Sequence, residues 1–194
     1  PPGDEPPDTY DYRPRKPTPS RGGAILGTDM GPYDYSKLEE ERPDILSYTS
    51  EPLGTELTII GPVTMKLFAS TSACGTDFVA RLLDVTPDGV AIPLVEGIVR
   101  MQVVAGDAKP GEVYEYDIDL WATAWTFLPG HSVRADIASA AFPHWDRNLN
   151  TCDEPFAMSE RTVTSTQAVY HDAARPSRIV LPVFRKNEDS KVSE

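Results

Sequence analysis

The feature that most constrains this chain is an alternation of apolar and polar residues that proline and glycine interrupt at short intervals. Alternation with a period of two predicts strands that bury one face. Alternating runs cover residues 63–69, 113–120, 132–138 and 177–184, and residues 77–85 and 92–104 look like more fully buried strands. Turn signals between them are Pro52-Leu53-Gly54, Gly61-Pro62, Pro87-Asp88-Gly89, Pro110-Gly111 and Pro129-Gly130. The chain therefore reads as many short strands joined by turns.

Proline and glycine account for 19 and 13 of the 194 residues. This much proline argues against a helical bundle, because proline breaks helix interiors and central strands. Only residues 33–42 and 153–160 leave room for a helical turn or a short helix. About eight strands with short turns are typical of an antiparallel sandwich or jelly roll. We predict an all-β fold, a jelly-roll β-sandwich.

The composition divides the chain into three segments. Residues 1–43 read as a Pro-rich N-terminal arm or linker, because their first half is rich in proline and charge without apolar periodicity. Residues 44–184 hold the predicted sandwich, and residues 185–194 form a polar tail. The chain begins with Pro1-Pro2 rather than Met, which favours a piece of a longer chain over a trimmed tag or a processed terminus.

The charge balance excludes several kinds of partner. With 30 acidic against 18 basic residues the net charge is −12, so we expect neither a nucleic-acid surface nor docking on anionic membranes. No apolar run approaches the length of a membrane span, and no signal peptide opens the chain. We expect a soluble protein, cytoplasmic or secreted, whose oligomeric state, a homo-oligomer included, the sequence leaves open.

Motifs that carry chemistry are absent from the sequence. It has no G-x-S-x-G on a strand-to-helix turn, no phosphate-binding loop, no dinucleotide fingerprint, no H-E-x-x-H and no C-x-x-C. The three histidines, His131, His144 and His171, are read as turn or surface residues, with a functional role kept open chiefly for His144. We therefore expect no catalytic residue, no cofactor and no metal in this chain.

Several residues remain candidates for a loop, interface or ligand role. The segment densest in rings, charges and amides holds Phe142, His144, Trp145, Asp146, Arg147 and Asn148. We favour a structural role here, in which side-chain to backbone bonds cap a turn. Asp77 is read in the same way, as a loop pin facing Arg147 or Arg81 rather than a ligand contact. The carboxylate and guanidinium groups suit such a pin because they pair with two parallel bonds.

Two tryptophans and two cysteines are further candidates for a binding, packing or disulfide role. Trp121 and Trp125 share a face if the run between them is extended, a pattern that in some sandwiches holds a sugar ring. We favour packing in the core or under a neighbouring domain instead. Cys74 and Cys152 both occur in turn-like segments. A disulfide between them is slightly favoured over reduced thiols and requires the two loops to meet at one end of the sandwich.

A series of short motifs resembles one known family. They are Asp44 to Leu53, Gly61-Pro62-Val63, Thr76 to Val85 with Pro87-Asp88-Gly89, Gly97 to Arg100, Pro110 to Tyr114, Phe127 to His131, Phe142-Pro143, Asp146 to Asn148, Asn150-Thr151, Val169 to Asp172, Pro176-Ser177 and Leu181 to Val183. In order and spacing they resemble the C-terminal domain of the X-Pro dipeptidyl-peptidase/cocaine esterase (CocE/NonD) hydrolases. The resemblance covers about residues 20–184.

The resemblance implies a galactose-binding-domain-like jelly roll that packs on an α/β-hydrolase domain upstream in the same chain. That upstream domain carries the Ser-His-Asp triad of the family, so no catalytic residue transfers to a position here. The implied function is that of an accessory domain which shapes and stabilises a serine hydrolase, an X-Pro dipeptidyl-peptidase or an acyl esterase. The alternative from another class is a free-standing carbohydrate-binding module centred on Trp121 or Trp125. An enzyme complete in these residues is the third and least favoured hypothesis.

Overall fold

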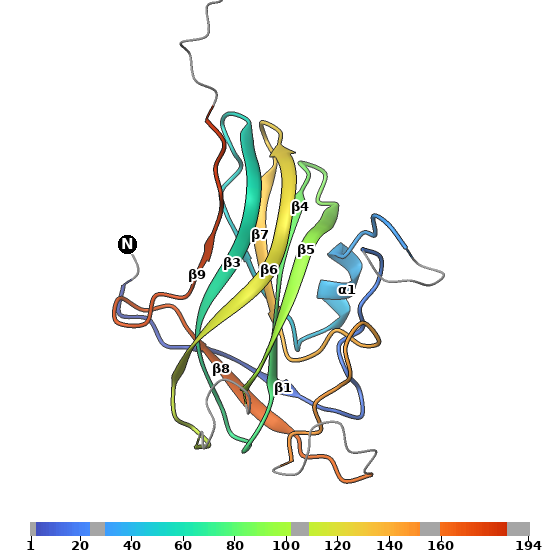
Figure 1. The fold of residues 1–194 in the computed structure, drawn as a ribbon, viewed down its shortest axis with the longest axis vertical. Helices are drawn as coiled ribbons and strands as arrows, with labels where there is room; N and C mark the ends of the chain where they lie inside the picture. The colour runs from blue at the N-terminus through green and yellow to red at the C-terminus, as the bar shows by residue number, and fades with distance from the viewer. Residues whose placement is uncertain (1–2, 24–29, 102–108, 152–159, 186–194) are drawn as a thin grey trace, which may run out of the picture.

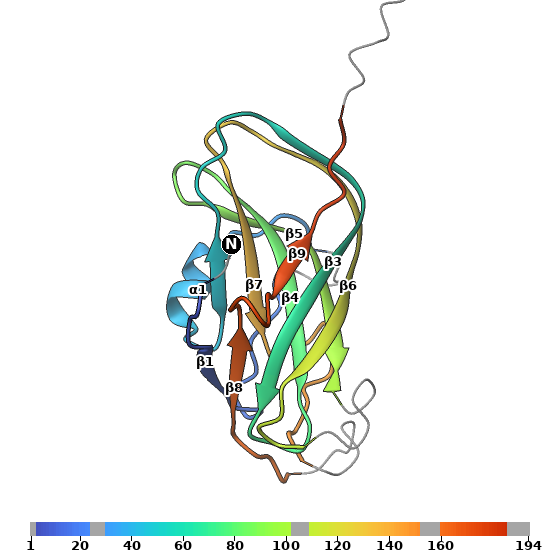
Figure 2. The ribbon, with the colours of Figure 1, turned by 90° about the vertical axis from the view of Figure 1, so that its left-hand side faces the viewer.

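The computed structural model describes residues 3–23, 30–101, 109–151 and 160–185. Nine strands and one short helix are present in this part of the chain. They are β1 (Asp8–Tyr12), α1 (Ser36–Glu41), β2 (Leu46–Thr49), β3 (Leu57–Thr71), β4 (Asp77–Val85), β5 (Ala91–Arg100), β6 (Tyr114–Phe127), β7 (Ser132–Ala138), β8 (Ser165–Tyr170) and β9 (Arg178–Val180). The long strands run along the long axis of the molecule (Figures 1 and 2).

The strands form two antiparallel sheets. One has the order β1-β8-β3-β6, with β9 also paired to β3, and the other has the order β2-β7-β4-β5. The predicted all-β sandwich is confirmed, while the jelly-roll order and the galactose-binding likeness stay predictions. The six predicted strand regions all contain strands, because the apolar pattern of a strand is a local property of the sequence. Residues 102–104 of the third region lie outside the described residues.

The core lies between the two sheets. On β3 the alternating residues Val63, Met65, Leu67 and Ala69 are buried, and on β6 Tyr116, Ile118 and Leu120 are buried. Phe78, Ala80 and Leu82 of β4 meet them from the other sheet. Full burial of each large apolar side chain contributes about 1.5–3 kcal/mol.

A second apolar cluster covers the outer face of the four-stranded sheet. Tyr35 and Leu38, from α1 and the residue before it, pack with Leu83 and Val85 of β4. Every residue of β4 is therefore buried, which explains its nearly continuous apolar sequence. In Figure 1, α1 lies to one side of the strands, on the side of β5. Asp34 Oδ1 accepts the N–H of Ser36 at 3.0 Å and caps this helix.

The N-terminal arm is only partly a linker. Residues 8–12 form β1, which pairs with β8, so the sheet draws a strand from the segment that we placed outside the sandwich. Tyr10 and Tyr12 are buried, and their hydroxyls bond the side chain of Ser139 and the carbonyl oxygen of Asn148. The alternation in this strand is only five residues long and sits between prolines, so its strand signal is weak.

The sequence also predicts two short helical regions and no membrane span. The first predicted helical region, 33–42, contains α1. The second, 153–160, lies almost wholly outside the described residues. Within the ranges given above, no helix is long and apolar enough to cross a membrane.

The two sheets approach each other closely at a glycine. A Cβ atom on Gly97 of β5 would lie 2.0 Å from the carbonyl oxygen of Asp119 on β6. These two strands end their respective sheets on the same side of the sandwich. Backbone contact at Gly97 therefore joins the two edges, and a groove lies beside this contact.

Candidate functional site

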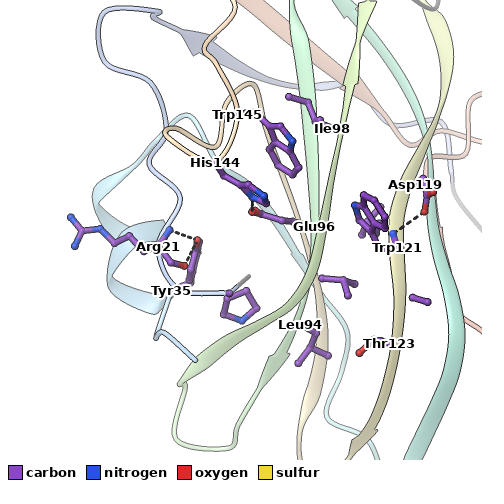
Figure 3. Close-up of a pocket in the computed structure, with 16 residues that line it drawn as sticks. Arg21, Tyr35, Leu94, Glu96, Ile98, Asp119, Trp121, Thr123, His144 and Trp145 are labelled. Atoms are coloured by element: carbon purple, nitrogen blue, oxygen red, sulfur yellow. Dashed lines mark hydrogen bonds and ion pairs between the residues drawn. The ribbon is translucent and has the colours of Figure 1, made fainter. Parts of the chain in front are cut away.

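The groove has a volume of about 670 Å³ and is built from four segments together with Tyr35, the residue before α1. Its walls are the arm at residues 21–23, β5 at residues 93–98, β6 at residues 119–123, and the loop residues His144 and Trp145. Figure 3 shows Trp121 projecting from β6 and, across β5 in this view, His144 and Trp145. The lining is mainly apolar and includes Leu94 and Ile98 of β5.

Trp121 owes its position to a β-bulge. The register of β3 and β6 shifts between Pro62 and Thr64, so that Leu120 and Trp121 both lie opposite Val63. Trp121 has a φ of 67°, which is unusual for a residue with a side chain. Its N–H donates to Asp119 Oδ1 at 2.8 Å. The side chain is 72% exposed.

A buried ionic network underlies the groove. Glu96 accepts a bond from Arg81 Nε at 2.6 Å through Oε2, and Glu96 Oε1 lies 2.6 Å from His144 Nδ1. Burial alone would raise the pKa of Glu96, but the charge of Arg81 and these hydrogen bonds outweigh it and hold the pKa below its ordinary value. His144 stacks on Trp145, with ring centroids 4.0 Å apart. The network therefore fixes the loop to β5.

The arm is tied to the same network. The guanidinium of Arg81 lies 5.4 Å from the centre of the Tyr35 ring, a cation–π distance. The Tyr35 hydroxyl donates to the carbonyl oxygen of Arg21 and accepts the N–H of Arg21 (Figure 3). Ser20 Oγ donates to Glu96 at 3.3 Å. The wall formed by the arm is thus held against the sheet by Tyr35 and by Glu96 of β5.

The arrangement has little reactive chemistry to offer. All three histidines pair with carboxylates: His131 with Asp84, His144 with Glu96, and His171 with Glu5 and Asp8. Nucleophilic catalysis instead needs a hydroxyl or thiol within reach of the base, and no such histidine contact is present in the part of the chain that the structure covers. Among the same residues there is no cluster of three or more histidine, cysteine or acidic side chains placed to hold a metal ion.

Asp77 anchors a second polar cluster, at the start of β4. Its side chain is 1% exposed and pairs with Arg100 through Oδ1–Nε at 2.9 Å and Oδ2–Nη2 at 2.8 Å. The predicted partners, Arg81 and Arg147, were wrong. The antiparallel register places Arg100 directly opposite Asp77 and Glu96 opposite Arg81. Arg147 instead donates to the carbonyl oxygen of Pro14 at 3.0 Å.

The loop after β7 is fastened to this cluster. Asn148 Nδ2 donates to Asp77 Oδ1 at 2.8 Å, and Asn148 Oδ1 accepts the N–H of Asn150 at 2.9 Å. The N–H of Phe142 donates to the carbonyl oxygen of Thr18, and the peptide bond between Phe142 and Pro143 is cis. Phe142 and Asp146 are exposed. The loop residues thus serve to hold the loop against the arm and the sheet.

We expect Asp77→Asn to lower the free energy of unfolding by about 2 kcal/mol, because the change removes the buried carboxylate charge that accepts two bonds from the Arg100 guanidinium. Urea unfolding of the chain measures the effect. The matched control is Glu51→Gln, which changes an exposed carboxylate between β2 and β3 and is expected to stay within about 0.5 kcal/mol of the parent. Equal effects of the two substitutions would contradict the structural role of Asp77.

The remaining predicted site residues lie apart from the groove or outside the described residues. Trp125 points its indole N–H at Asp84 Oδ2, at 3.0 Å, and does not line the groove with Trp121. Cys74 is disulfide-bonded. Its predicted partner Cys152 lies outside the described residues, so the pairing stays a prediction. The ion pair between Arg81 and Glu96 was not predicted from the sequence. A charged residue inside each of two apolar strands is the signal that could have indicated a buried pair.

The fold and the site together define a class: a β-sandwich module whose charged clusters hold loops and whose most exposed tryptophan lines a groove. The profile of the X-Pro dipeptidyl-peptidase C-terminal non-catalytic domain matches residues 2–180. The chain therefore belongs to this family, the one that its motifs resemble.

Known proteins similar to this chain are hydrolases. The cocaine esterase of Rhodococcus sp. (strain MB1 Bresler) is 41% identical over 192 residues, which are 95% of this chain and 33% of that protein. The crystal structure of an aminopeptidase from a marine sediment Thaumarchaeota archaeon matches 95% of this chain and 34% of its own, with a TM-score of 0.84 and 31% identity. An α-amino acid ester hydrolase matches 94% of this chain and 33% of its own, with a TM-score of 0.80 and 28% identity. The chain thus spans about a third of the length of these relatives.

Proposed function

We propose that this chain is the accessory domain of a serine hydrolase that cleaves esters, and that it shapes and stabilises a catalytic domain in the same polypeptide. The observation that carries the proposal is the family match, combined with the chain's coverage of a third of its esterase relative. The relative's name supports an ester as the substrate class. Ester hydrolysis by such an enzyme proceeds through serine attack, with a histidine moving the proton.

The internal chemistry of the domain supports a non-catalytic role. Its histidines contact carboxylates, and Asp77 and Glu96 pair with arginines, so that these groups hold the loops and the arm against the sheets. A free-standing carbohydrate-binding module is not favoured by the family match. The two tryptophans on which that hypothesis depended do not form one platform, because Trp125 turns to Asp84 while Trp121 lines the groove.

The test compares the full-length protein with a version that lacks this domain. We expect the full-length protein to hydrolyse p-nitrophenyl acetate and the isolated chain to have no activity above its buffer blank. Removal of the domain is expected to lower the melting temperature of the remainder by at least about 5 °C, because an apolar surface loses its cover. Full activity and unchanged melting after removal would refute the stabilising role.

A further inference from the structure

The described residues present several exposed apolar surfaces, and two of them are compared as places where a partner could dock. One is the groove beside β5 and β6, with Trp121 at its edge. The other, which we call the outer patch, lies around β9 and the facing end of β3 and is made of Ile60, Val180, Val183 and Phe184. The groove is concave and lined by two tryptophans, whereas the outer patch consists mainly of aliphatic side chains. Concave surfaces with tryptophan anchors are where binding energy concentrates.

Trp121 is held outward by the backbone. An exposed tryptophan on a loop could fold back onto neighbouring apolar atoms, but Trp121 sits in a paired strand at a bulge with positive φ. Its N–H bond to Asp119 holds this conformation. A non-glycine residue with positive φ costs free energy of order 1–3 kcal/mol. The local structure therefore keeps a large apolar side chain in position for a partner.

The polar groups around the groove indicate the chemistry of that partner. Glu96 is already bonded to Arg81 and His144, and Asp119 Oδ1 to the backbone of Trp121. The hydroxyl of Tyr35 is used by Arg21. Arg21 and Thr123 also line the groove, but its lining is mainly apolar. The engaged carboxylate of Glu96 and the large apolar area favour apolar protein side chains over a sugar or an ion.

We propose that the groove is the surface on which the catalytic domain docks, and that Trp121 is the anchor of this interface. The inference rests on the proposed function. In the matched relatives about two thirds of the polypeptide lies outside the part that corresponds to this chain. One wall of the groove is the arm at residues 21–23, fixed to the sheet through Tyr35, so a docked partner contacts arm and sandwich together. A partner in the same polypeptide is present at high effective concentration, so an interface of the size of this groove is enough for stable docking.

Hydroxyl-radical footprinting tests the docking surface. The oxidation rate of Trp121 is measured by mass spectrometry in this chain alone and in the full-length protein. We expect the rate to fall at least about fivefold in the full-length protein, because residues at the centre of an interface lose nearly all their exposed area. Phe184, 48% exposed in the outer patch, is the matched control. An unchanged rate at Trp121 overturns the proposal, and protection of Phe184 alone assigns the docking surface to the outer patch.

A variant separates docking from folding. Because Trp121 is mostly exposed, Trp121→Ser is expected to shift the melting temperature of the isolated chain by less than about 2 °C. In the full-length protein it is expected to lower the melting temperature by several times that shift. Val183→Ser in the outer patch is the control, because it also replaces an exposed apolar side chain by serine. Equal effects of both variants on the melting temperature of the full-length protein overturn the proposal.

The full-length protein and the isolated chain also distinguish a failure of the proposed docking surface from a failure of the proposed function. If the full-length protein hydrolyses p-nitrophenyl acetate and needs the domain for stability, but Trp121 is not protected, then the docking surface is wrong and the proposed function stands. If Trp121 is protected but the full-length protein has no esterase activity, then the docking surface stands and the proposed reaction is wrong.

Discussion

Gly97→Ala is expected to lower the free energy of unfolding of this chain by at least about 3 kcal/mol, a large part of the stability of an ordinary domain. A Cβ atom at this position would lie 2.0 Å from the carbonyl oxygen of Asp119 and 2.8 Å from its carbonyl carbon. These are backbone atoms of a paired strand, so they cannot turn aside as the end of a flexible side chain would. β5 and β6 must separate, and the apolar contacts between the sheets loosen with them.

Urea unfolding measures this effect, with Gly54→Ala as the matched control. A Cβ atom on Gly54 would have no atom within 4 Å, and this glycine needs no positive φ. Alanine there is expected to leave stability unchanged or to raise it by up to about 1 kcal/mol, because it restricts the unfolded chain. If Gly97→Ala were as harmless as Gly54→Ala, the close contact between the two edge strands would be wrong.

Arg81→Met is expected to lower the free energy of unfolding by about 3–5 kcal/mol. The Arg81 side chain is fully buried, and its loss leaves the largely buried Glu96 without the cation that neutralises it. Asp136, which faces Arg81 across β4 and β7, is buried as well. Methionine fills much of the volume but carries no charge. Urea unfolding at pH 7 measures the loss.

The double variant Arg81→Met/Glu96→Gln tests whether the pair is the cause. Removing the stranded carboxylate is expected to restore at least about 1 kcal/mol relative to Arg81→Met alone. Strictly additive effects of the two substitutions would show that the ion pair is not what Arg81 contributes.

The pH dependence of the Arg81→Met variant follows from the pKa of Glu96. In the parent, this pKa is lowered, so the contribution of Glu96 to stability is present above its unfolded pKa and is lost only as the pH falls through the folded pKa. Without Arg81, burial dominates and the folded pKa of Glu96 rises above the unfolded value. The variant is then penalised as the pH rises through that raised pKa. We expect the stability gap between parent and variant to narrow from pH 7 to pH 5.

Much of the fold could be predicted from the sequence, and particular strands show why. On β3, Val63, Met65 and Leu67 alternate with polar residues, and that pattern alone identifies the buried face. β1 escaped prediction because its short alternation lies among prolines and is stabilised by pairing with β8, far away in the sequence. A long alternating pattern is enough to identify a strand from the sequence. Where the pattern is short, pairing with a strand distant in the sequence decides whether the segment becomes a strand.

The candidate site was less accessible to sequence reasoning. Asp77 was recognised as a pin, but its partner Arg100 depends on the register of β4 with β5. Trp121 was singled out, but its separation from Trp125 depends on a bulge opposite Val63. A shift of one residue in register moves a side chain to the other face of a sheet. The sequence around Trp121 does not reveal such a shift.

The sequence by itself determined the all-β class, the positions of most strands and turns, the buried faces, and the family through its ordered motifs. These depend on interactions between residues close in the chain, or on a pattern that can be read position by position. Only the tertiary structure decided which charges pair, that the arm contributes a strand and a groove wall, and that Trp121 stands exposed beside Gly97. These depend on which strands become neighbours and in what register, a choice made by the packing of the whole chain.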